Sequence, residues 1–214
     1  MLLTLLYHQI SHSKYGNPLP LFEKHLSYIA NRYQTVHPGD TVPANKLSIC
    51  LTFDDATFDF YALIFPLLQK YQLKAVLAVP TAFIPHHITH TQEERLKLLS
   101  EYKQPKTSAS SPAFCSWDEL RFLSGSPLIE IASHSVNHLP FSKEIVDIEY
   151  ELYASKLVLK EMLKKTPKTF VYPFGRFTSS SHARAKEHYP FIMRIGSALN
   201  IDWYNRNQII YRVN

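Results

Sequence analysis

Short apolar runs and amphipathic segments alternate along this chain of 214 residues. The apolar runs predict strands at residues 2–7, 47–53, 74–79, 128–132, 169–172, 191–195 and 209–213. Apolar residues at helical spacing predict helices at residues 19–33, 58–71, 117–123, 142–165 and 179–187. Strands separated by helices indicate βα units with a parallel sheet, and about seven such strands suit a closed α/β barrel.

Local signals refine these elements. Ser116 and Ser142 precede predicted helices and are expected to cap them, and Pro66 is expected to bend the helix over 58–71. The face of the first helix that points to the core is expected to carry Leu21, Phe22, Leu26 and Ile29.

Residues 80–114 are the least regular stretch, and we expect an insertion there with a short helix around 92–102. The insertion contains His86, His87 and His90, but no matching carboxylate accompanies them, so solvated loop histidines are favoured over a metal site. The length and the 45% of hydrophobic residues predict that residues 1–214 form a single domain.

The formal charge of +5 does not predict a nucleic-acid site, because only 19% of the residues are charged and the basic ones are scattered. The one dense basic cluster lies at the end of a predicted helix, where cations favour the helix dipole; it comprises Lys160, Lys164, Lys165 and Lys168. Cys50 and Cys115 predict neither a disulfide framework nor a thiolate metal site.

No apolar run approaches the ~20 residues that span a bilayer, and the first residues lack the order of a signal peptide. We therefore expect a cytoplasmic protein if Met1 is the native start, and otherwise an exported one whose leader has been removed. The sequence leaves the oligomeric state open.

Polar or turn residues follow several of the predicted strands: His8, the pair Asp54-Asp55, His134 and the turn Pro173-Phe174-Gly175. In parallel barrels the working residues lie at the carboxyl ends of the strands, so these residues are expected to share one rim. Adjacent aspartates are common in turns and helix caps, so the pair Asp54-Asp55 does not by itself indicate a functional site.

His134 and His138 are four positions apart, which predicts two imidazoles on one side of a helical turn. With an oxygen from one of the two aspartates they would form a site with open positions for a Lewis-acid metal. Zn²⁺ is the first expectation, and Co²⁺, Ni²⁺ or Mn²⁺ fit the same ligands.

The sequence resembles the polysaccharide deacetylases, carbohydrate esterase family 4. The resemblance is carried by Thr52-Phe53-Asp54-Asp55, His134-Ser135-Val136-Asn137-His138 and Tyr172-Pro173-Phe174-Gly175, which look like the first three motifs of that family in order. It implies a distorted (β/α)7 barrel that removes acetyl groups from N-acetylglucosamine units, or less often from O-acetylated sugars. It also implies Asp54 as general base, Asp55, His134 and His138 as metal ligands, and a metal-activated water as nucleophile.

Two departures from the family pattern concern the acid and the arginine. No histidine follows His188, whereas Leu6-Tyr7-His8-Gln9-Ile10 resembles the N-terminal motif of a permuted branch that deacetylates poly-β-1,6-N-acetylglucosamine. This likeness implies a circularly permuted barrel with His8 as general acid. The arginine that many members carry before the third motif is absent, and either Arg176 or Arg212 could replace it.

Further residues are expected to bind substrate or support the site. They are Tyr172, Pro173, Phe174, Gly175 and Arg176, together with Asp202-Trp203, which either resembles the fourth motif or forms a surface turn. The expected function is metal-dependent deacetylation of an N-acetylglucosamine-containing saccharide. The alternatives are a catalytically silent carbohydrate-binding domain of the same fold and a deacetylase or amidase acting on a small cytoplasmic substrate.

Overall fold

The computed structural model describes residues 1–11, 16–101, 111–204 and 207–214. Across these residues, seven parallel strands close into a barrel in the order β1, β10, β9, β8, β7, β6, β5 and back to β1. The barrel strands are β1 Leu2–Tyr7, β5 Ser48–Phe53, β6 Ala75–Val79, β7 Ile129–Ser133, β8 Thr169–Val171, β9 Phe191–Ile195 and β10 Ile210–Val213. The expected seven-stranded α/β barrel is confirmed.

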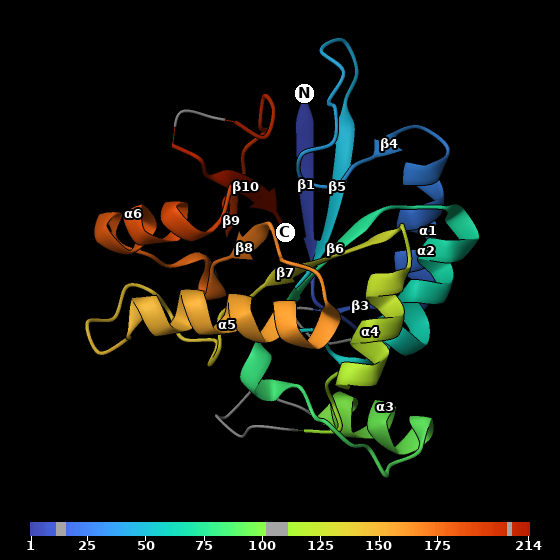
Figure 1. Cartoon of the computed structure of the whole chain (residues 1–214). Helices are drawn as coiled ribbons and strands as arrows, with labels where there is room; N and C mark the ends of the chain where they lie inside the picture. The colour runs from blue at the N-terminus through green and yellow to red at the C-terminus, as the bar shows by residue number, and fades with distance from the viewer. Residues whose placement is uncertain (12–15, 102–110, 205–206) are drawn as a thin grey trace.

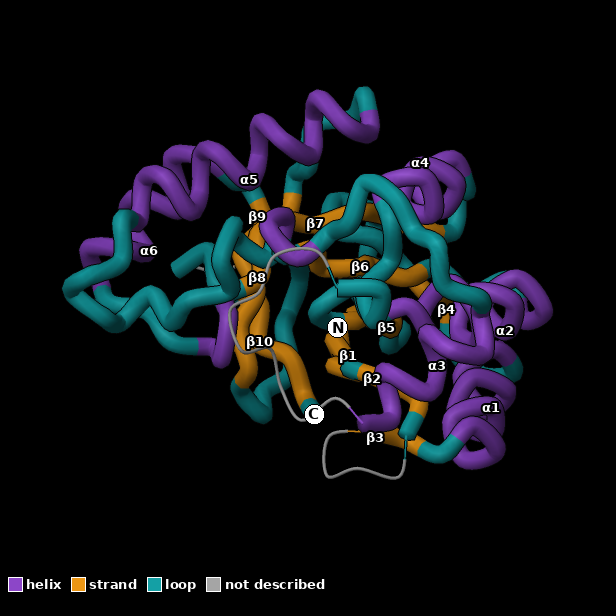
Figure 2. The backbone as a smooth tube through the Cα atoms, turned by 90° about the horizontal axis from the view of Figure 1, so that it is seen from below, coloured by secondary structure: helices purple, strands orange, loops and turns teal. Residues whose placement is uncertain are grey.

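Short strands and helices complete the fold. β4 (Gln34–Thr35) pairs with the start of β5, and β2 (Gln9–Ile10) pairs with β3 (Gly16–Asn17). The α-helices are α1 Leu19–Ala30, α2 Phe65–Tyr71, α3 Gln92–Glu101, α4 Trp117–Gly125, α5 Ile148–Leu163 and α6 Ser179–His188. Figure 2 shows α1, α2, α4, α5 and α6 outside the ring of strands. No helix among the described residues is long and apolar enough to cross a membrane.

Side-chain alternation divides the core into an interior and an outer layer. In β1, Leu2, Thr4 and Leu6 are buried, whereas the residues between them are only partly buried. Leu2 packs inside the barrel with apolar residues of the other strands, including Cys50, Val76, Ala132 and Met193. The outer layer joins the strands to the helices, so both faces of the sheet are covered, as parallel sheets require.

The helix predicted over 142–165 begins later than expected. Ser142 does not cap it; α5 starts at Ile148, and the Asp147 side chain accepts a hydrogen bond from the Tyr150 N–H. Phe141 and Val146 are both buried, which keeps the preceding segment in an irregular path against the barrel. Tertiary packing therefore decides between two residues that are both good helix caps.

Two other helix predictions need correction. Leu21 is not on the core face of α1: its side chain is 45% exposed, whereas Phe22, Leu26 and Ile29 are buried. The segment over 58–71 is helical throughout, as expected, but it is not α-helical throughout, because a π-helix, η1 (Phe60–Ile64), precedes α2. η1 runs directly into α2, with the Phe65 N–H donating to the Phe60 carbonyl, and Pro66, which has no N–H to donate, follows this junction.

The irregular stretch 80–114 contains a 3-10 turn, η2 (Thr81–Phe83), and then α3, while residues 102–110 lie outside the described part. Arg95 of α3 is 3% exposed and forms a bidentate pair with Glu119 of α4, at 2.6 and 3.0 Å. The Glu119 carboxylate also accepts the Ser116 N–H, so the expected cap Ser116 forms a capping box with Glu119 at the start of α4. This pair anchors α3 beyond the carboxyl ends of the strands (Figure 1).

Candidate functional site

The two aspartates directly follow β5 on the rim formed by the carboxyl ends of the strands. The Asp54 N–H donates to the Tyr7 carbonyl at 3.0 Å, which continues the pairing of β1 with β5 and places His8 in the neighbouring position. Asp55 has a φ of 74° and Ala56 a φ of 53°, so the chain reverses sharply after Asp54. The two side chains differ in exposure: 4% for Asp54 and 24% for Asp55.

His134 follows β7, and His138 lies in the same loop. The expected helical turn between them is absent, because Ser135 and His138 adopt φ values of 69° and 52°. The Ser135 hydroxyl instead accepts the His138 N–H at 3.0 Å and closes a compact turn. The histidine rings still meet, with their Nε2 atoms 3.1 Å apart.

Asp55, His134 and His138 form a ligand group whose three donor atoms all lie within 4.8 Å of one another. Asp55 Oδ1 is 3.3 Å from His138 Nε2 and 3.7 Å from His134 Nε2. His134 Nδ1 lies 2.8 Å from the Val171 carbonyl, which can only accept, so Nδ1 carries the proton and Nε2 offers its lone pair. Two imidazole nitrogens and one carboxylate oxygen with this orientation fit a zinc-type cation.

Burial lowers the pKa of His134 to about 4, although the nearby Asp54 carboxylate opposes this effect. The His134 ring is therefore neutral at pH 7, which is the state that binds a metal.

Arg212, on β10, forms a fork-shaped ion pair with Asp54 inside the barrel. Its two terminal nitrogens donate to Asp54 Oδ1 at 2.6 Å and Oδ2 at 2.9 Å, and the Arg212 side chain has no solvent exposure. Burial alone would raise the pKa of Asp54, but the charges of Arg212, His134 and, more weakly, His8 hold it well below its usual range. Asp54 is therefore a carboxylate near neutral pH, which a general base must be.

The geometry distinguishes the two arginines that sequence reasoning left open. Arg212 binds Asp54 directly, whereas Arg176 is solvent-exposed and its carbonyl accepts the Phe141 N–H. β10 pairs with β1 in a register that sets Arg212 beside Thr4, so closure of the barrel brings the last strand next to the first.

The turn Pro173–Gly175 (η3) follows β8 and contributes one aromatic ring to the site. Phe174 has a φ of 57°, is 49% exposed, and its ring centroid lies 4.8 Å from that of His138. Gly175 has a φ of 63°, and a Cβ there would come within 3.1 Å of the Ile195 backbone nitrogen, so glycine is favoured at this position. Tyr172 and Pro173 are buried, and the Tyr172 hydroxyl pairs with His182 Nδ1 at 3.1 Å.

Asp202 and Trp203 do not lie at this site, so of the two interpretations that the sequence left open the site role is wrong and the turn is favoured. Trp203 Nε1 donates to the Asp40 carbonyl at 2.8 Å, and its ring packs on Phe191, the first residue of β9. Because β9 and β10 are parallel, their connection must return to the amino end of the barrel, opposite the site. Asp202 Oδ1 accepts the Tyr204 N–H there, as in a surface turn.

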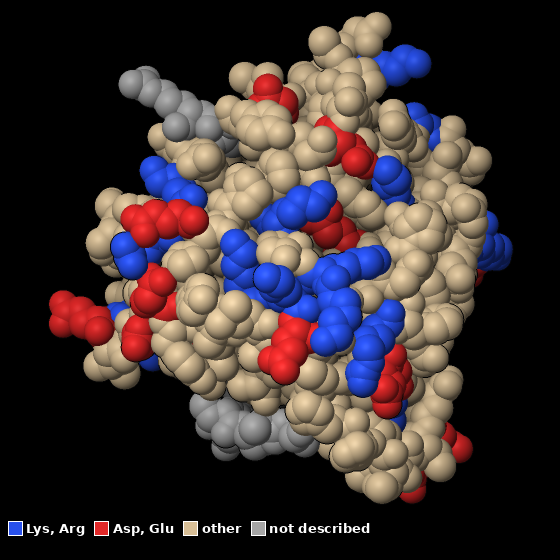
Figure 3. Space-filling model, viewed as in Figure 1, with Lys and Arg blue, Asp and Glu red and all other residues tan. Residues whose placement is uncertain are grey.

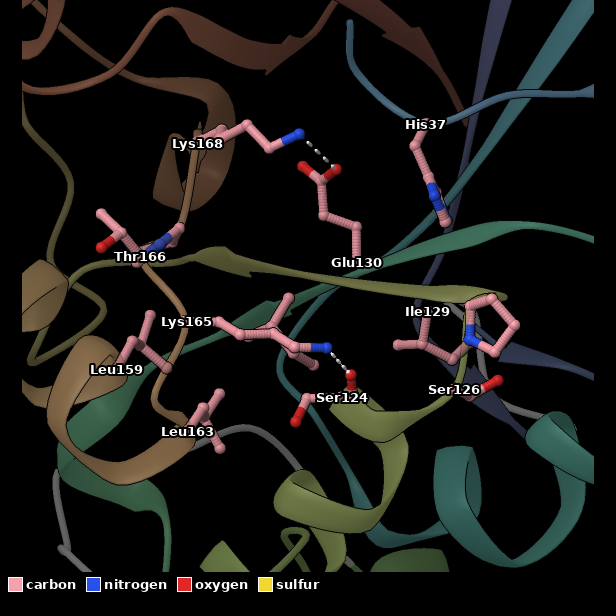
Figure 4. A pocket seen from close by; sticks show the side chains of 13 residues that line it. His37, Ser124, Ser126, Ile129, Glu130, Leu159, Leu163, Lys165, Thr166 and Lys168 are labelled. Carbon is pink, nitrogen blue, oxygen red and sulfur yellow. Dashed lines mark hydrogen bonds and ion pairs between the residues drawn. The ribbon is translucent and has the colours of Figure 1, made fainter. Parts of the chain in front are cut away.

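A cavity of about 410 Å³ opens at the amino end of β7 and is separate from this group. Figure 4 shows Lys168 pointing toward Glu130 and Lys165 toward Ser124. Lys165 donates to the Ser124 carbonyl near the end of α4, where cations are favourable. Figure 3 shows basic side chains gathered near the middle of the face seen in Figure 1, with acidic side chains among them. His86, His87 and His90 are exposed elsewhere.

Sequence reasoning missed a buried carboxylate, Asp59, which joins two segments of the rim. Asp59 has no solvent exposure and its Oδ2 accepts the Ile10 N–H at 2.5 Å, so it links the η1 helix to the segment after His8. Burial raises the pKa of Asp59 to about 6, although the Ile10 N–H opposes this effect.

The pKa of Asp59 predicts a specific pH dependence of stability. The folded state binds a proton at Asp59 more tightly than the unfolded state between about pH 4 and 6, so stability falls as pH rises through this window. Asp59→Asn removes this titration and can still accept the Ile10 N–H. Between pH 4.5 and 7.5 we expect the wild type to lose about 2 kcal/mol relative to the variant. Urea unfolding in the presence of a chelator measures this difference, and parallel pH profiles would contradict it.

Comparisons with solved structures agree with the fold described above. IcaB from Ammonifex degensii superposes with a TM-score of 0.77 at 19% identity, covering 99% of this chain and 90% of that one. The Streptococcus pyogenes deacetylase PplD, solved in complex with acetate, has a TM-score of 0.74 at 21% identity and covers 99% and 91% of the two chains.

Sequence comparisons identify relatives of the chain. It is 26% identical over 197 residues to YxkH of Bacillus subtilis (strain 168), covering 86% of this chain and 60% of the length of YxkH. It is 30% identical over 95 residues to the poly-β-1,6-N-acetyl-D-glucosamine N-deacetylase of Escherichia coli (strain K12), covering 44% of this chain and 13% of that one. The family model for polysaccharide deacetylase matches residues 41–189. Because this match spans well over half of the chain, the protein belongs to the polysaccharide deacetylase family.

Proposed function

We propose that this protein is a metal-dependent hydrolase that removes N-acetyl groups from an N-acetylglucosamine-containing saccharide. The observation that carries the proposal is the Arg212–Asp54 pair beside the group of Asp55, His134 and His138. His134 Nε2 is 3.8 Å from Asp54 Oδ2, so a carboxylate base adjoins a metal-ligand set. A domain that only binds sugar has no need of a base in that position.

Asp55, His134 and His138 would hold the cation, with Zn²⁺ as first candidate and Co²⁺, Ni²⁺ or Mn²⁺ as alternatives. When bound, such an ion supplies Lewis-acid polarisation of the acetyl carbonyl and lowers the pKa of water from ~16 toward ~7. Asp54 accepts the proton of the attacking water, and Arg212 keeps this carboxylate ionised and oriented.

The turn after β8 supplies a backbone donor that can stabilise the oxyanion of the transition state. The N–H groups of Gly175 and Arg176 donate to the Tyr172 and Pro173 carbonyls, and we assign the Phe174 N–H as the donor to the oxyanion. One such donor contributes about 3 kcal/mol to transition-state binding. The exposed Phe174 ring beside His138 is also suited to stacking on a sugar ring.

His8 is our candidate for the acid that protonates the departing amine. It follows β1 next to Asp54, and its charge contributes to the lowered pKa of Asp54, so the two side chains lie within electrostatic range. Transfer of this proton to nitrogen releases the free amino sugar and acetate, since an unprotonated amine is a poor leaving group. This assignment would match the permuted branch, with the acid at the opposite end of the chain from its usual position.

Replacing His8 by Ala is expected to lower kcat on an N-acetylated saccharide by about 10²–10⁴-fold. The acid is not needed for p-nitrophenyl acetate, whose leaving group departs as an anion, so hydrolysis of that ester should be nearly unchanged. Parallel assays of the two substrates on the zinc-loaded variant make the comparison. An equal loss on both substrates would show that His8 acts in another way.

The substrate class is tested by an acetate-release screen with the zinc-loaded protein. The screen compares chitooligosaccharides, β-1,6-linked N-acetylglucosamine oligomers, peptidoglycan fragments, acetylated xylan and small N-acetylated amides. We expect acetate from the N-acetylglucosamine oligomers. The name of the Escherichia coli relative makes the β-1,6-linked series the first candidate. Release only from acetylated xylan or only from small amides would refute the proposed substrate while leaving the chemistry in place.

A further inference from the structure

The loop that carries both histidines is fastened to α5 by one buried side chain, Glu151. Its Oε2 accepts the Val136 and Asn137 N–H groups at 2.8 Å each, and its Oε1 accepts the Asn137 side-chain amide at 2.7 Å. Glu151 is 2% exposed. These bonds hold Val136 and Asn137 in place. The residues on either side, Ser135 and His138, both have left-handed backbone conformations.

The Glu151 charge is balanced by N–H groups. Glu151 forms no ion pair with any of the described residues. Its negative charge is stabilised by the N–H groups of the loop and by its position in the first turn of α5, where the helix dipole favours anions. A buried carboxylate is costly unless it is fully hydrogen-bonded. An apolar residue in place of Glu151 would leave the Val136 and Asn137 N–H groups without this acceptor, so the carboxylate has a role in the loop.

The position of His138 depends on this loop. His138 reaches Asp55 Oδ1 at 3.3 Å only with the turn at residues 135–138 closed, and the Ser135 hydroxyl that closes it lies directly before the two N–H groups held by Glu151. His134 is fixed separately by β7 and by the Val171 carbonyl. Loss of Glu151 should therefore release His138 more than His134.

We propose that Glu151 is a positioning residue that holds His138 in place for the metal ion. The inference rests on the metal centre of the proposed function. Groups that orient the ligands of a metal without touching it commonly change affinity by about 10- to 100-fold. The sequence carried a signal for Glu151, because this acidic residue shares the buried face of α5 with Leu152, Ser155 and Leu159.

The test compares Glu151→Gln with Glu130→Gln. Glu130 is a matched control because it is also a largely buried carboxylate with a hydrogen bond, from Thr169 at 2.8 Å, but lies toward the opposite end of β7. Zinc affinity is measured by competition with a chromophoric chelator. Hydrogen exchange of residues 134–138 is followed in the metal-free protein. We expect Glu151→Gln to bind zinc about 10- to 100-fold more weakly and to exchange faster in this loop, with both values unchanged in Glu130→Gln.

Other outcomes distinguish a failure of the role of Glu151 from a failure of the proposed metal centre. Wild-type zinc affinity in Glu151→Gln, or an equal loss in Glu130→Gln, would overturn the role of Glu151. If the wild type binds no zinc, the metal centre fails, and unchanged loop exchange in Glu151→Gln would then also overturn its hold on the loop. Should Glu151→Gln not fold, Asn137→Ala removes one of the three bonds and is expected to weaken zinc binding in the same direction; unchanged affinity in that variant counts against the role.

Discussion

Asp54→Asn is expected to lower kcat for acetate release by about 10²–10⁴-fold, the usual contribution of a general base. The amide fills the same space and can still accept a hydrogen bond from Arg212, but it cannot take a proton from water. Asp55, His134 and His138 are untouched, so zinc binding should remain. Measured kcat on the best N-acetylated substrate, with zinc content determined for the same samples, tests this expectation.

A fall in zinc content together with activity would mean that Asp54 acts as a ligand instead of a base. Activity within about tenfold of the wild type at full zinc content would exclude Asp54 as the base altogether. The matched control is Asp118→Asn, since Asp118 is an exposed aspartate on α4 whose ion pair with Arg121 is on the surface. That variant should keep wild-type activity.

Arg212→Met is expected to destabilise the protein by about 3–5 kcal/mol near pH 7.5, because it leaves the Asp54 carboxylate buried without its counter-charge. The pKa of Asp54 should then rise, since burial raises it once Arg212 is removed. In the wild type, the low folded pKa of Asp54 contributes stability that is lost as pH falls below the range of a free aspartate. In the variant the pH dependence of stability is reversed, because the pKa of Asp54 is raised, and stability should fall as pH rises.

Urea unfolding of the wild type, Arg212→Met, Asp54→Asn and the double variant forms a cycle that isolates this pair. We expect the double variant to be more stable than the sum of the two single losses predicts, because neither charge is left alone. Arg176→Met is the control and should change stability by no more than about 0.5 kcal/mol, since Arg176 is exposed. Equal effects of the Arg212 and Arg176 substitutions would contradict the assignment of Arg212 to Asp54.

The barrel could be predicted from the sequence because its strands are apolar runs of the buried parallel type. The strands at 2–7 and 191–195 have the predicted bounds. The start of α5 could not be predicted, because Ser142 and Asp147 both have capping chemistry and burial of Phe141 and Val146 decides between them.

Within the site, the meeting of Asp55, His134 and His138 follows from the rule that side chains after parallel strands share one rim. The identity of the arginine could not be derived, because it depends on β10 closing the barrel beside β1. The choice between the two interpretations of Asp202-Trp203 could not be made from the sequence, because a two-residue likeness says nothing about which end of the barrel a loop occupies.

The most direct test of the central claim is acetate release from N-acetylglucosamine oligomers by the same protein sample in metal-free and zinc-reconstituted form. The proposed function predicts acetate and an equal amount of free amino sugar with zinc, none after chelation, and none from zinc-treated Asp55→Ala. Tight binding of the oligomers without acetate, in the presence of Zn²⁺, Co²⁺, Ni²⁺ or Mn²⁺, would contradict it and would identify a binding domain that keeps the fold without the reaction.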